Sequence, residues 1–201
     1  MSAPLPPLGA RLMMILPQDG MADLGACLDA GDVAAVIWRG EPAADQVEAA
    51  QARDVAALVE GMPAGAAAAW LDGAHVSDPA ALKGALAALK PGAIVGAGGL
   101  SNRHDAMLAG ESGADYVLFG ALAGDAAGFP RTLDLAAWWA ELFEVPCVGV
   151  AASLDEVEAL ARAGADFVAL SGPLLEAGRG PQNVAAAMAR LAAAQTGEAG
   201  A

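Results

Sequence analysis

The stretch that decides the fold is Pro91–Gly120, which reads PGAIVGAGGLSNRHDAMLAGESGADYVLFG. Its apolar run Ala93–Ala97 lies between two glycines, is too short for a helix and fits a strand buried on both faces. The pair Gly98–Gly99 then allows a sharp turn, after which Ser101 or Asn102 can cap a helix. A second strand, Tyr116–Phe119, follows that helix directly. A strand–helix–strand unit of this kind predicts two parallel strands.

The end of this stretch is repeated elsewhere in the chain. A glycine, an aspartate and an apolar strand follow one another in Gly31–Trp38, Gly113–Gly120 and Gly164–Gly172. Each copy is typical of a helix that ends at glycine and passes into a buried strand. The irregular spacing of the copies favours a wound α/β fold over a solenoid with a fixed period.

Over the whole chain the pattern gives eight strands, each followed by a helix or the remnant of one. Eight units favour closure into a (βα)8 TIM barrel of the α/β class, with a flavodoxin-like open sheet as the alternative. We expect one domain over residues 11–195, with a flexible arm at 1–10 and a tail at 196–201. The expected strands are Arg11–Leu16, Val33–Trp38, two within Ala64–Val76, Ala93–Ala97, Tyr116–Phe119, Cys147–Val150 and Phe167–Leu170.

The third unit is the irregular one. The segment Ala44–Glu60 reads as a single long helix with apolar residues at helical spacing, ending at Gly61. Strands three and four must then both lie within Ala64–Val76, where Ala66–Trp70 fits a strand and a helix equally well. Since little room is left for a helix between them, the sequence predicts a shortened third unit.

The composition narrows the kinds of partner. The 201 residues carry a formal net charge of −14, which disfavours nucleic acid and anionic membranes because both need a basic surface. A phosphorylated small molecule can still bind to so acidic a protein if backbone N–H groups and a few arginines form a local positive site. The longest apolar stretch, Gly61–Leu71, is well short of a membrane span. Cys27 and Cys147 match no metal-binding spacing, and two distant cysteines fit a reducing compartment. We therefore expect a cytoplasmic protein. Homo-oligomers are left open.

Active sites of such barrels lie where the strands end. Arg39 is the strongest anion-binding candidate, because it directly follows a strand and should point into the barrel mouth; Glu41 can instead pair with it. Arginines in loops also serve simply to solvate them. Four of the ten basic residues lie in loops at this end: Arg39, Arg103, Arg131 and Arg179.

Three turns rich in small residues can bring backbone N–H groups to a phosphate, although the same residues suit ordinary turns. These turns contain Gly98 and Gly99, Ala152 and Ser153, and Ser171 and Gly172. Carboxylates near the mouth can hold Mg²⁺ together with substrate phosphates, and Asp78 fits equally well as a helix cap. The acidic candidates are Asp19, Glu41, Asp78 and Asp125.

Other polar and aromatic residues carry weaker signals. We expect His75 in the barrel lining or the core, and His104 on the exposed side of a helix. Trp38 is the tryptophan that can line a pocket. No nucleophile–base pair is evident in the sequence, so the catalytic residues stay unassigned.

From Arg11 to about Leu175 the chain resembles the thiamine-phosphate synthase / TenI family of barrels. The resemblance is carried by Val36–Arg39 against the family pattern V-Q-L-R, by Asp72–Val76 against D-G-V-H-L, and by Gly113–Gly120 against G-A-D-Y-x-x-x-G. It extends to Val145–Val150 and Val168–Ser171. True synthases of this family join a hydroxymethylpyrimidine diphosphate to a thiazole phosphate with Mg²⁺.

The resemblance implies roles for individual residues. Arg39 matches the diphosphate-binding arginine, Ser171–Gly172 match the phosphate loop after strand eight, and Asp78 matches a Mg²⁺ ligand if a gap is allowed. Other positions depart from the family pattern. Ile37 replaces its glutamine, Glu41 lies near its lysine, and Ala64–Trp70 lacks the Asn-Asp pair after strand three. Ala121–Asp125 replaces the Thr-and-Lys loop after strand six, and Ala151–Ala152 replace the Gly-Gly after strand seven.

The resemblance implies a thiamine-phosphate-synthase-like transferase. The missing residues favour an alternative, a catalytically impaired paralogue that binds a phosphorylated small molecule. A TenI-like thiazole tautomerase is a third reading, which is disfavoured because His104 lies beyond the family's fifth-loop histidine position.

Overall fold

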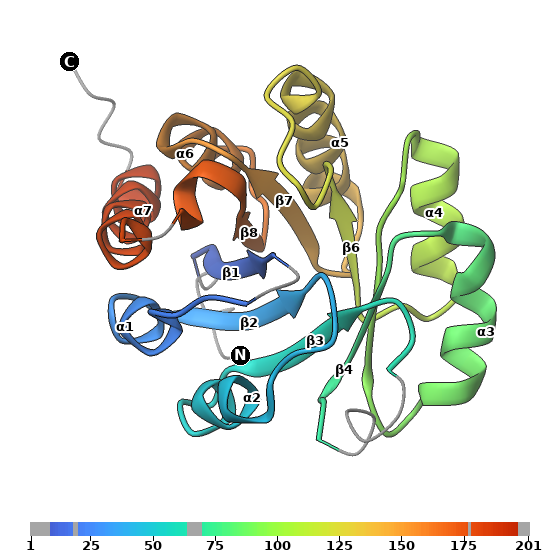
Figure 1. Ribbon diagram of the computed structural model, residues 1–201. Coiled ribbons are helices and arrows are strands. Elements are labelled where there is room, and N and C mark those ends of the chain that lie inside the picture. The colour runs from blue at the N-terminus through green and yellow to red at the C-terminus, as the bar shows by residue number, and fades with distance from the viewer. Residues whose placement is uncertain (1–8, 18–19, 64–69, 177, 197–201) are drawn as a thin grey trace, which may run out of the picture.

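Eight parallel strands close into a barrel in the order of the sequence, with the helices outside them (Figure 1). A computed structural model describes residues 9–17, 20–63, 70–176 and 178–196. Closure is made by β1 and β8, where Leu12 lies beside Val168. The predicted TIM barrel is therefore confirmed. The strands are β1 Arg11–Leu16, β2 Val33–Trp38, β3 Ala56–Glu60, β4 Gly73–Val76, β5 Ile94–Ala97, β6 Tyr116–Phe119, β7 Cys147–Ala151 and β8 Phe167–Leu170.

Three of the helices begin at a residue whose side chain caps them. Side chains of Asp78, Asn102 and Ser153 each accept a hydrogen bond from a backbone N–H in the first turn of the helix that follows. A 3-10 turn after β8, η2 (Gly172–Leu175), was not predicted. The helices are α1 Leu24–Asp29, α2 Ala44–Gln51, α3 Pro79–Leu89, α4 Arg103–Glu111, α5 Phe129–Leu142, α6 Leu154–Arg162 and α7 Gly180–Thr196.

The third unit differs from the prediction. The segment Ala44–Glu60 is not one helix, because α2 ends at Gln51 and Asp54 takes a left-handed conformation with φ of 57°. Strand β3 therefore precedes Ala64, and within the described residues 70–76 the strand is β4, which takes up the last four of them. Of the apolar residues with helical spacing, Val47 and Ala50 do lie in α2, whereas Leu58 and Val59 belong to β3, which pairs with β2 and β4. Most of the poly-alanine segment, residues 64–69, lies outside the described residues, as do residues 1–8 of the expected arm and 197–201 of the tail.

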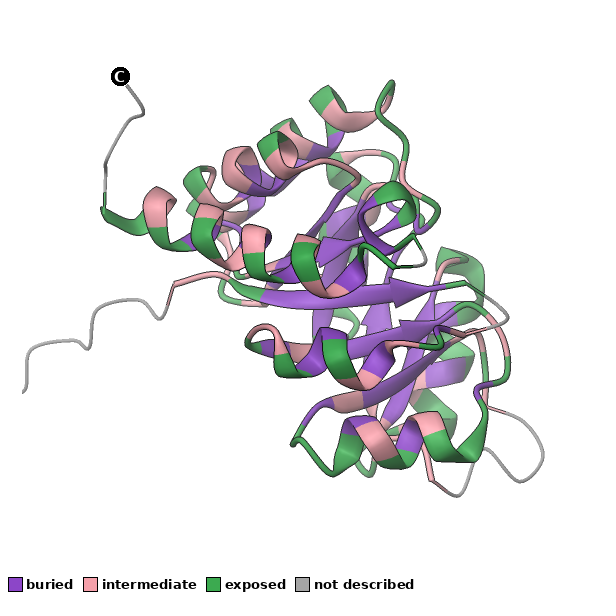
Figure 2. Ribbon diagram, turned by 60° about the vertical axis from the view of Figure 1, so that its left-hand side comes forward, coloured by how far each residue is buried: buried purple, intermediate pink, exposed green. Residues whose placement is uncertain are grey.

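The barrel has a core on each side of its wall, because side chains alternate along each strand. The interior is filled by residues such as Met13, Ile37 and Leu118, and the outer core lies between the strands and the helices. Trp38 belongs to this outer core and is fully buried. The suggestion that it lines a pocket at the mouth is therefore wrong. Figure 2 shows the buried strands and the exposed outer faces of the helices.

The repeated aspartates connect neighbouring strands. Asp115 accepts a hydrogen bond from the N–H of Val95 at 2.7 Å, and Asp166 accepts one from the N–H of Cys147 at 2.8 Å. Each carboxylate thus satisfies a backbone N–H next to or at the start of the preceding strand. The third copy differs, because Asp32 pairs with Arg11 at 2.7 Å. The repeat is accordingly a structural device at the end of the barrel opposite the mouth.

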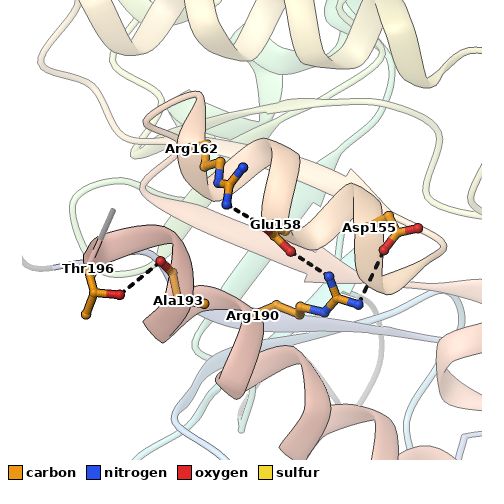
Figure 3. A network of polar contacts seen from close by, with 6 residues as sticks. All are labelled: Asp155, Glu158, Arg162, Arg190, Ala193 and Thr196. Carbon is orange, nitrogen blue, oxygen red and sulfur yellow. Dashed lines mark hydrogen bonds and ion pairs between the residues drawn. The ribbon is translucent and has the colours of Figure 1, made fainter. Parts of the chain in front are cut away.

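Charged side chains also join the last two helices (Figure 3). Arg190 of α7 contacts Glu158 at 2.5 Å and Asp155 at 3.4 Å, both on α6. Arg162 pairs with the same Glu158 at 2.7 Å. Among the described residues, no helix is both long and apolar enough to span a membrane.

Candidate functional site

Two cavities open among the loops at the C-terminal ends of the strands. The larger is about 540 Å³ and is lined by Ile15, Met21 and Gly172, among others. The smaller is about 220 Å³ and is lined by residues that include Glu60 and His75. Arg39 lines both cavities. It is the basic residue among their described lining residues, whereas Asp23, Glu60 and Glu176 are acidic.

Arg39 lies at the mouth, as the sequence predicted. Its backbone N–H donates to the carbonyl of Leu16 at 3.2 Å, which continues the pairing of β1 and β2. The Arg39 side chain is 41% exposed, and its Nε lies 3.6 Å from Oε2 of Glu60. The acidic partner is thus Glu60 on the neighbouring strand, and not Glu41, which the sequence offered as the alternative. A partly exposed pair at this distance is weak and leaves most of the guanidinium donors available.

Glu60 is the mouth residue that sequence reasoning missed. It ends β3, and its Oε1 accepts a hydrogen bond from the hydroxyl of Ser77 at 2.9 Å. It was assigned to the end of a helix, so its position beside Arg39 went unnoticed. The available signal was the run Ala56–Val59, which has the length and composition of a buried strand followed by glycine.

The turn after β7 holds one of the protein's own carboxylates. The N–H of Ala152 donates to Oε2 of Glu156 at 2.7 Å, and Ser153 Oγ accepts from the N–H of Glu156 at 3.3 Å. This arrangement resembles a capping box, in which the third residue of a helix folds back over its own N-terminus. A phosphate that used the N–H of Ala152 would have to displace Glu156.

The turn after β8 is arranged differently. Ser171 is fully buried, and its hydroxyl donates to the carbonyl of Ala151 at 3.5 Å. Gly172 has a φ of 54° and lines the larger cavity. A glycine suits this left-handed conformation and lets a ligand approach the backbone. Of the three predicted small-residue turns, this one borders the larger cavity.

Gly98 and Gly99 lie at the other side of the mouth. A Cβ at Gly98 would lie 2.4 Å from Nε2 of His75, so the glycine makes room for that ring. Gly99 has a φ of 68° and lines the smaller cavity. Both glycines therefore shape the space around His75.

The other predicted anion-binding arginines have protein partners or lie apart. Arg103 pairs with Asp134 at 3.5 Å and stacks 5.0 Å from the ring centre of Trp138. Arg131 donates to the carbonyl of Ser101 at 2.8 Å. Both begin or lie in helices rather than in loops. Arg179 is exposed in the turn before α7 and is absent from the lining of both mouth cavities.

His75 lies inside the barrel, as expected. It is fully buried, and its Nδ1 lies 3.0 Å from the hydroxyl oxygen of Tyr116. Burial lowers the pKa of His75 to about 4 and raises that of Tyr116 above its ordinary value, so both groups are neutral at pH 7. Its Nε2 is buried without a hydrogen-bond partner among the described residues.

A model of the family described as thiamine monophosphate synthase matches residues 24–174 of this chain. The chain belongs to this family. It is 40% identical over 179 residues to a thiamine-phosphate synthase of Rhodospirillum centenum, and the match covers 82% of this chain and 86% of that protein. A thiamine-phosphate synthase of Hyphomonas neptunium is 33% identical over 186 residues, covering 80% and 84% of the two proteins.

Solved structures agree on the fold. The thiamine phosphate pyrophosphorylase of Pyrococcus furiosus superimposes with a TM-score of 0.71, covering 92% of this chain and 96% of that one at 17% identity. The resemblance to the thiamine-phosphate synthase / TenI family is thus confirmed. The protein is a thiamine-phosphate-synthase-like barrel.

The family implies Mg²⁺, and two carboxylates near the mouth that could bind it already have partners within the chain. Asp78 caps α3, with Oδ1 accepting from the N–H of Ala80 at 3.0 Å. Glu60 is engaged by Ser77 and Arg39. Among the described residues, no group of three or more His, Cys, Asp or Glu side chains is placed to hold a metal ion. The predicted candidate Asp19 lies outside the described residues. Since Mg²⁺ usually binds to one or two carboxylates together with substrate phosphates, its binding at this mouth stays a prediction.

Proposed function

We propose that this family member binds phosphorylated small molecules at the barrel mouth and joins a hydroxymethylpyrimidine diphosphate to a thiazole phosphate. The observation that carries the proposal is Arg39, which lies at the position of the family's diphosphate-binding arginine and lines both cavities of the mouth. The two curated relatives described above, both called thiamine-phosphate synthase, support it over more than four fifths of their length.

The residues at the mouth suggest how the ligands are held. Arg39 offers a planar fork of N–H donors that suits phosphate oxygens. Across the larger cavity, Gly172 begins η2 and its small size allows a phosphate to reach the backbone. In this proposal the chain's own residues bind and orient the two substrates. The thiazole nitrogen bonds to the methylene carbon of the pyrimidine while the bond from that carbon to the diphosphate oxygen breaks, and inorganic pyrophosphate leaves.

A second function, ligand binding without turnover, is favoured by one specific observation. Glu156 fills the N-terminus of α6 and takes the N–H of Ala152, which lies in the loop that commonly binds phosphate in these barrels. A site that binds a single phosphorylated ligand at Arg39 and Gly172 needs no second phosphate position. This function corresponds to a non-catalytic paralogue of the synthases.

One assay separates the two functions. The protein is incubated with hydroxymethylpyrimidine diphosphate, thiazole phosphate and Mg²⁺, and thiamine phosphate is measured by chromatography. Formation of thiamine phosphate above a heat-denatured control supports the synthase. Calorimetric binding of thiamine phosphate without product formation supports the paralogue, and the lack of both refutes the proposed mouth site.

The buried thiols of Cys27 and Cys147 are compatible with a cytoplasmic setting for either function.

Arg39 gives the first prediction. Replacing Arg39 by alanine should weaken the binding of thiamine phosphate by about 1.5–3 kcal/mol, the range for hydrogen bonds to charged groups. Arg39→Lys should also lose affinity, because a point charge replaces a two-pronged donor. Titration calorimetry measures both variants, with Arg103→Ala as a matched control because Arg103 pairs with Asp134 outside the cavities. Unchanged affinity together with a lower melting temperature would mean that Arg39 is structural.

A further inference from the structure

Exposed apolar side chains gather on α4 and α5, two consecutive helices outside the barrel (Figure 1). Among the described residues four large apolar side chains are exposed, and three of them lie on these helices: Met107 and Leu108 on α4, and Leu142 on α5. The fourth, Met62, lies in the loop after β3. Single exposed apolar residues are ordinary, whereas neighbouring ones mark a surface that binds another molecule.

The two helices touch near both ends of α4. At its start, Arg103 stacks 5.0 Å from the ring centre of Trp138 and pairs with Asp134, both on α5. Near its end, a Cβ at Gly110 would lie 2.7 Å from the ring of Trp139. Helix α4 therefore runs alongside the tryptophans of α5.

Aromatic rings continue past the end of α5. The ring centre of Phe143 lies 4.0 Å from that of Trp139, on which it stacks, and 5.2 Å from that of Trp138. Trp139 is fully buried, whereas Trp138 and Phe143 are partly exposed. The three rings thus form a rigid base that is open to solvent on one side.

Two of the exposed apolar residues border this base. Met107 follows Arg103 by four residues, and Leu142 follows Trp138 by four, so each lies one turn further along the same helix face. We call Met107, Trp138, Leu142 and Phe143 the α4–α5 patch. None of the four lines either cavity of the mouth, so the patch is separate from the candidate site.

The free charges around the patch are negative. Glu111 ends α4, and Glu141 and Glu144 lie at the end of α5; all three are exposed. None of them forms an ion pair with a described residue. The arginines of these helices, Arg103 and Arg131, already have partners within the chain. A complementary molecule is therefore apolar at its centre and basic at its edges.

We propose that the α4–α5 patch is a docking surface for a basic amphipathic helix of another protein. The apolar face of that helix covers Trp138 and Leu142, and its flanking lysines or arginines pair with Glu111, Glu141 and Glu144. Tryptophan is a frequent anchor of such interfaces. A second copy of this chain fits less well, because a twofold contact would bring the same carboxylates together, and the net charge of −14 also opposes self-association.

The test uses a fluorescein-labelled helical peptide of leucine and lysine with its leucines on one face. Its length of about 14 residues, or about 21 Å, matches that of α5. Fluorescence anisotropy at physiological salt should show saturable binding of one peptide per chain. A peptide of the same composition with its leucines scattered should bind about tenfold more weakly. A leucine–glutamate peptide of the same pattern should not bind.

A variant of the patch tests the apolar contact. Leu142→Ser should weaken binding of the leucine–lysine peptide about tenfold, the effect of losing one apolar anchor. Met62→Ser is the matched control, because Met62 is exposed elsewhere, and it should bind like the wild type. Both positions are on the surface, and circular dichroism establishes that the variants fold.

A second pair of variants tests the charges. Glu141→Gln combined with Glu144→Gln should weaken peptide binding and reduce its dependence on salt. Asp45→Asn combined with Glu48→Gln removes the same charge from the exposed side of α2 and should leave binding unchanged.

Three results would overturn the proposal. Equal binding of the leucine–glutamate peptide would show that the carboxylates select nothing, and equal effects of the two charge variants would show a general attraction to an acidic protein. A dimer in sedimentation velocity that Leu142→Ser dissociates would mean that a second copy covers the patch. None of these results depends on the proposed function at the mouth.

Discussion

At the scale of the residue, His75 is the group whose protonation the fold changes most clearly. Its ring lies between the Tyr116 hydroxyl and Gly98 in the barrel interior. Burial lowers its pKa from 6.5 to about 4, since no carboxylate forms a hydrogen bond with it to favour the charged form among the described residues. Its neutral state is thus a property of the tertiary structure.

This lowered pKa predicts a loss of stability in mild acid. Between about pH 6.5 and pH 4 the unfolded chain binds a proton at His75 that the folded protein does not. The free energy of unfolding should therefore fall as the pH decreases through this window, by up to about 3 kcal/mol at 1.36 kcal/mol per pKa unit. Urea unfolding at several pH values, for the wild type and His75→Gln, measures this contribution.

The comparison isolates one residue from the rest of the acid response. Carboxylates paired with arginine, such as Asp32, also lose stabilising contacts in acid, but they do so in both proteins. His104→Gln is the matched control, because His104 is exposed on α4. The prediction fails if the wild type and His75→Gln lose stability in parallel between pH 6.5 and 4.

At the scale of the element, the N-terminus of α6 shows how a local sequence can close a potential ligand site. The segment Ser153–Glu156 places a hydroxyl at the N-cap and a carboxylate three residues later, and both are used within the chain. Acidic groups are favoured at this end of a helix by its dipole. The same physics would attract a phosphate, so the two compete for one N–H.

Removing the carboxylate should separate these effects. Glu156→Ala should lower the free energy of unfolding by about 0.5–2 kcal/mol, as the loss of a helix cap does. The same variant should bind inorganic phosphate more tightly than the wild type, because the N–H of Ala152 is freed and a negative charge is removed. Denaturant unfolding and calorimetry measure the two quantities. Asp155→Ala is the control, because Asp155 is next to Glu156 in the sequence but its carboxylate pairs with Arg190. Tighter binding in both variants would indicate a general charge effect.

At the scale of the whole molecule, closure makes every strand a neighbour of two others. The chain's first and last strands pair with each other, and the interior core is shared by strands from both halves of the sequence. An open sheet would leave two edges and would let the halves separate more independently. The barrel should therefore lose its structure as a unit.

This cooperativity is testable with the chain's own tryptophans. Trp38 on β2 and Trp139 on α5 are both fully buried and report on opposite halves of the sequence. Tryptophan fluorescence and far-ultraviolet circular dichroism should give coincident urea transitions. A variant with both Trp38→Phe and Trp70→Phe then reports on the second half alone, through Trp138 and Trp139, and should unfold in a single step of similar steepness. Separate transitions for the two probes would contradict a single folding unit.

The barrel, the family and most of the strands could be predicted from the sequence, because these depend on local features. Short apolar runs, helix caps at Asp78, Asn102 and Ser153, and the repeated glycine–aspartate phrase each act within a few residues. They failed at Ala44–Glu60, where a helical spacing and a strand run overlap, and they predicted neither η2 nor the helical positions of Arg103 and Arg131. In β3, the pairing of these residues with β2 and β4 outweighed the helical spacing.

Only the tertiary structure decided the surroundings of the mouth. Closure places Glu60 beside Arg39 and His75 against Tyr116, although 21 and 41 residues respectively separate these partners. Likewise, folding turns Trp38 outward and places Nε2 of His75 beside Gly98, where no other described residue forms a hydrogen bond with it. The physical reason is that charge pairing and desolvation depend on distance in space. The sequence does not give those distances until the chain has closed into its barrel.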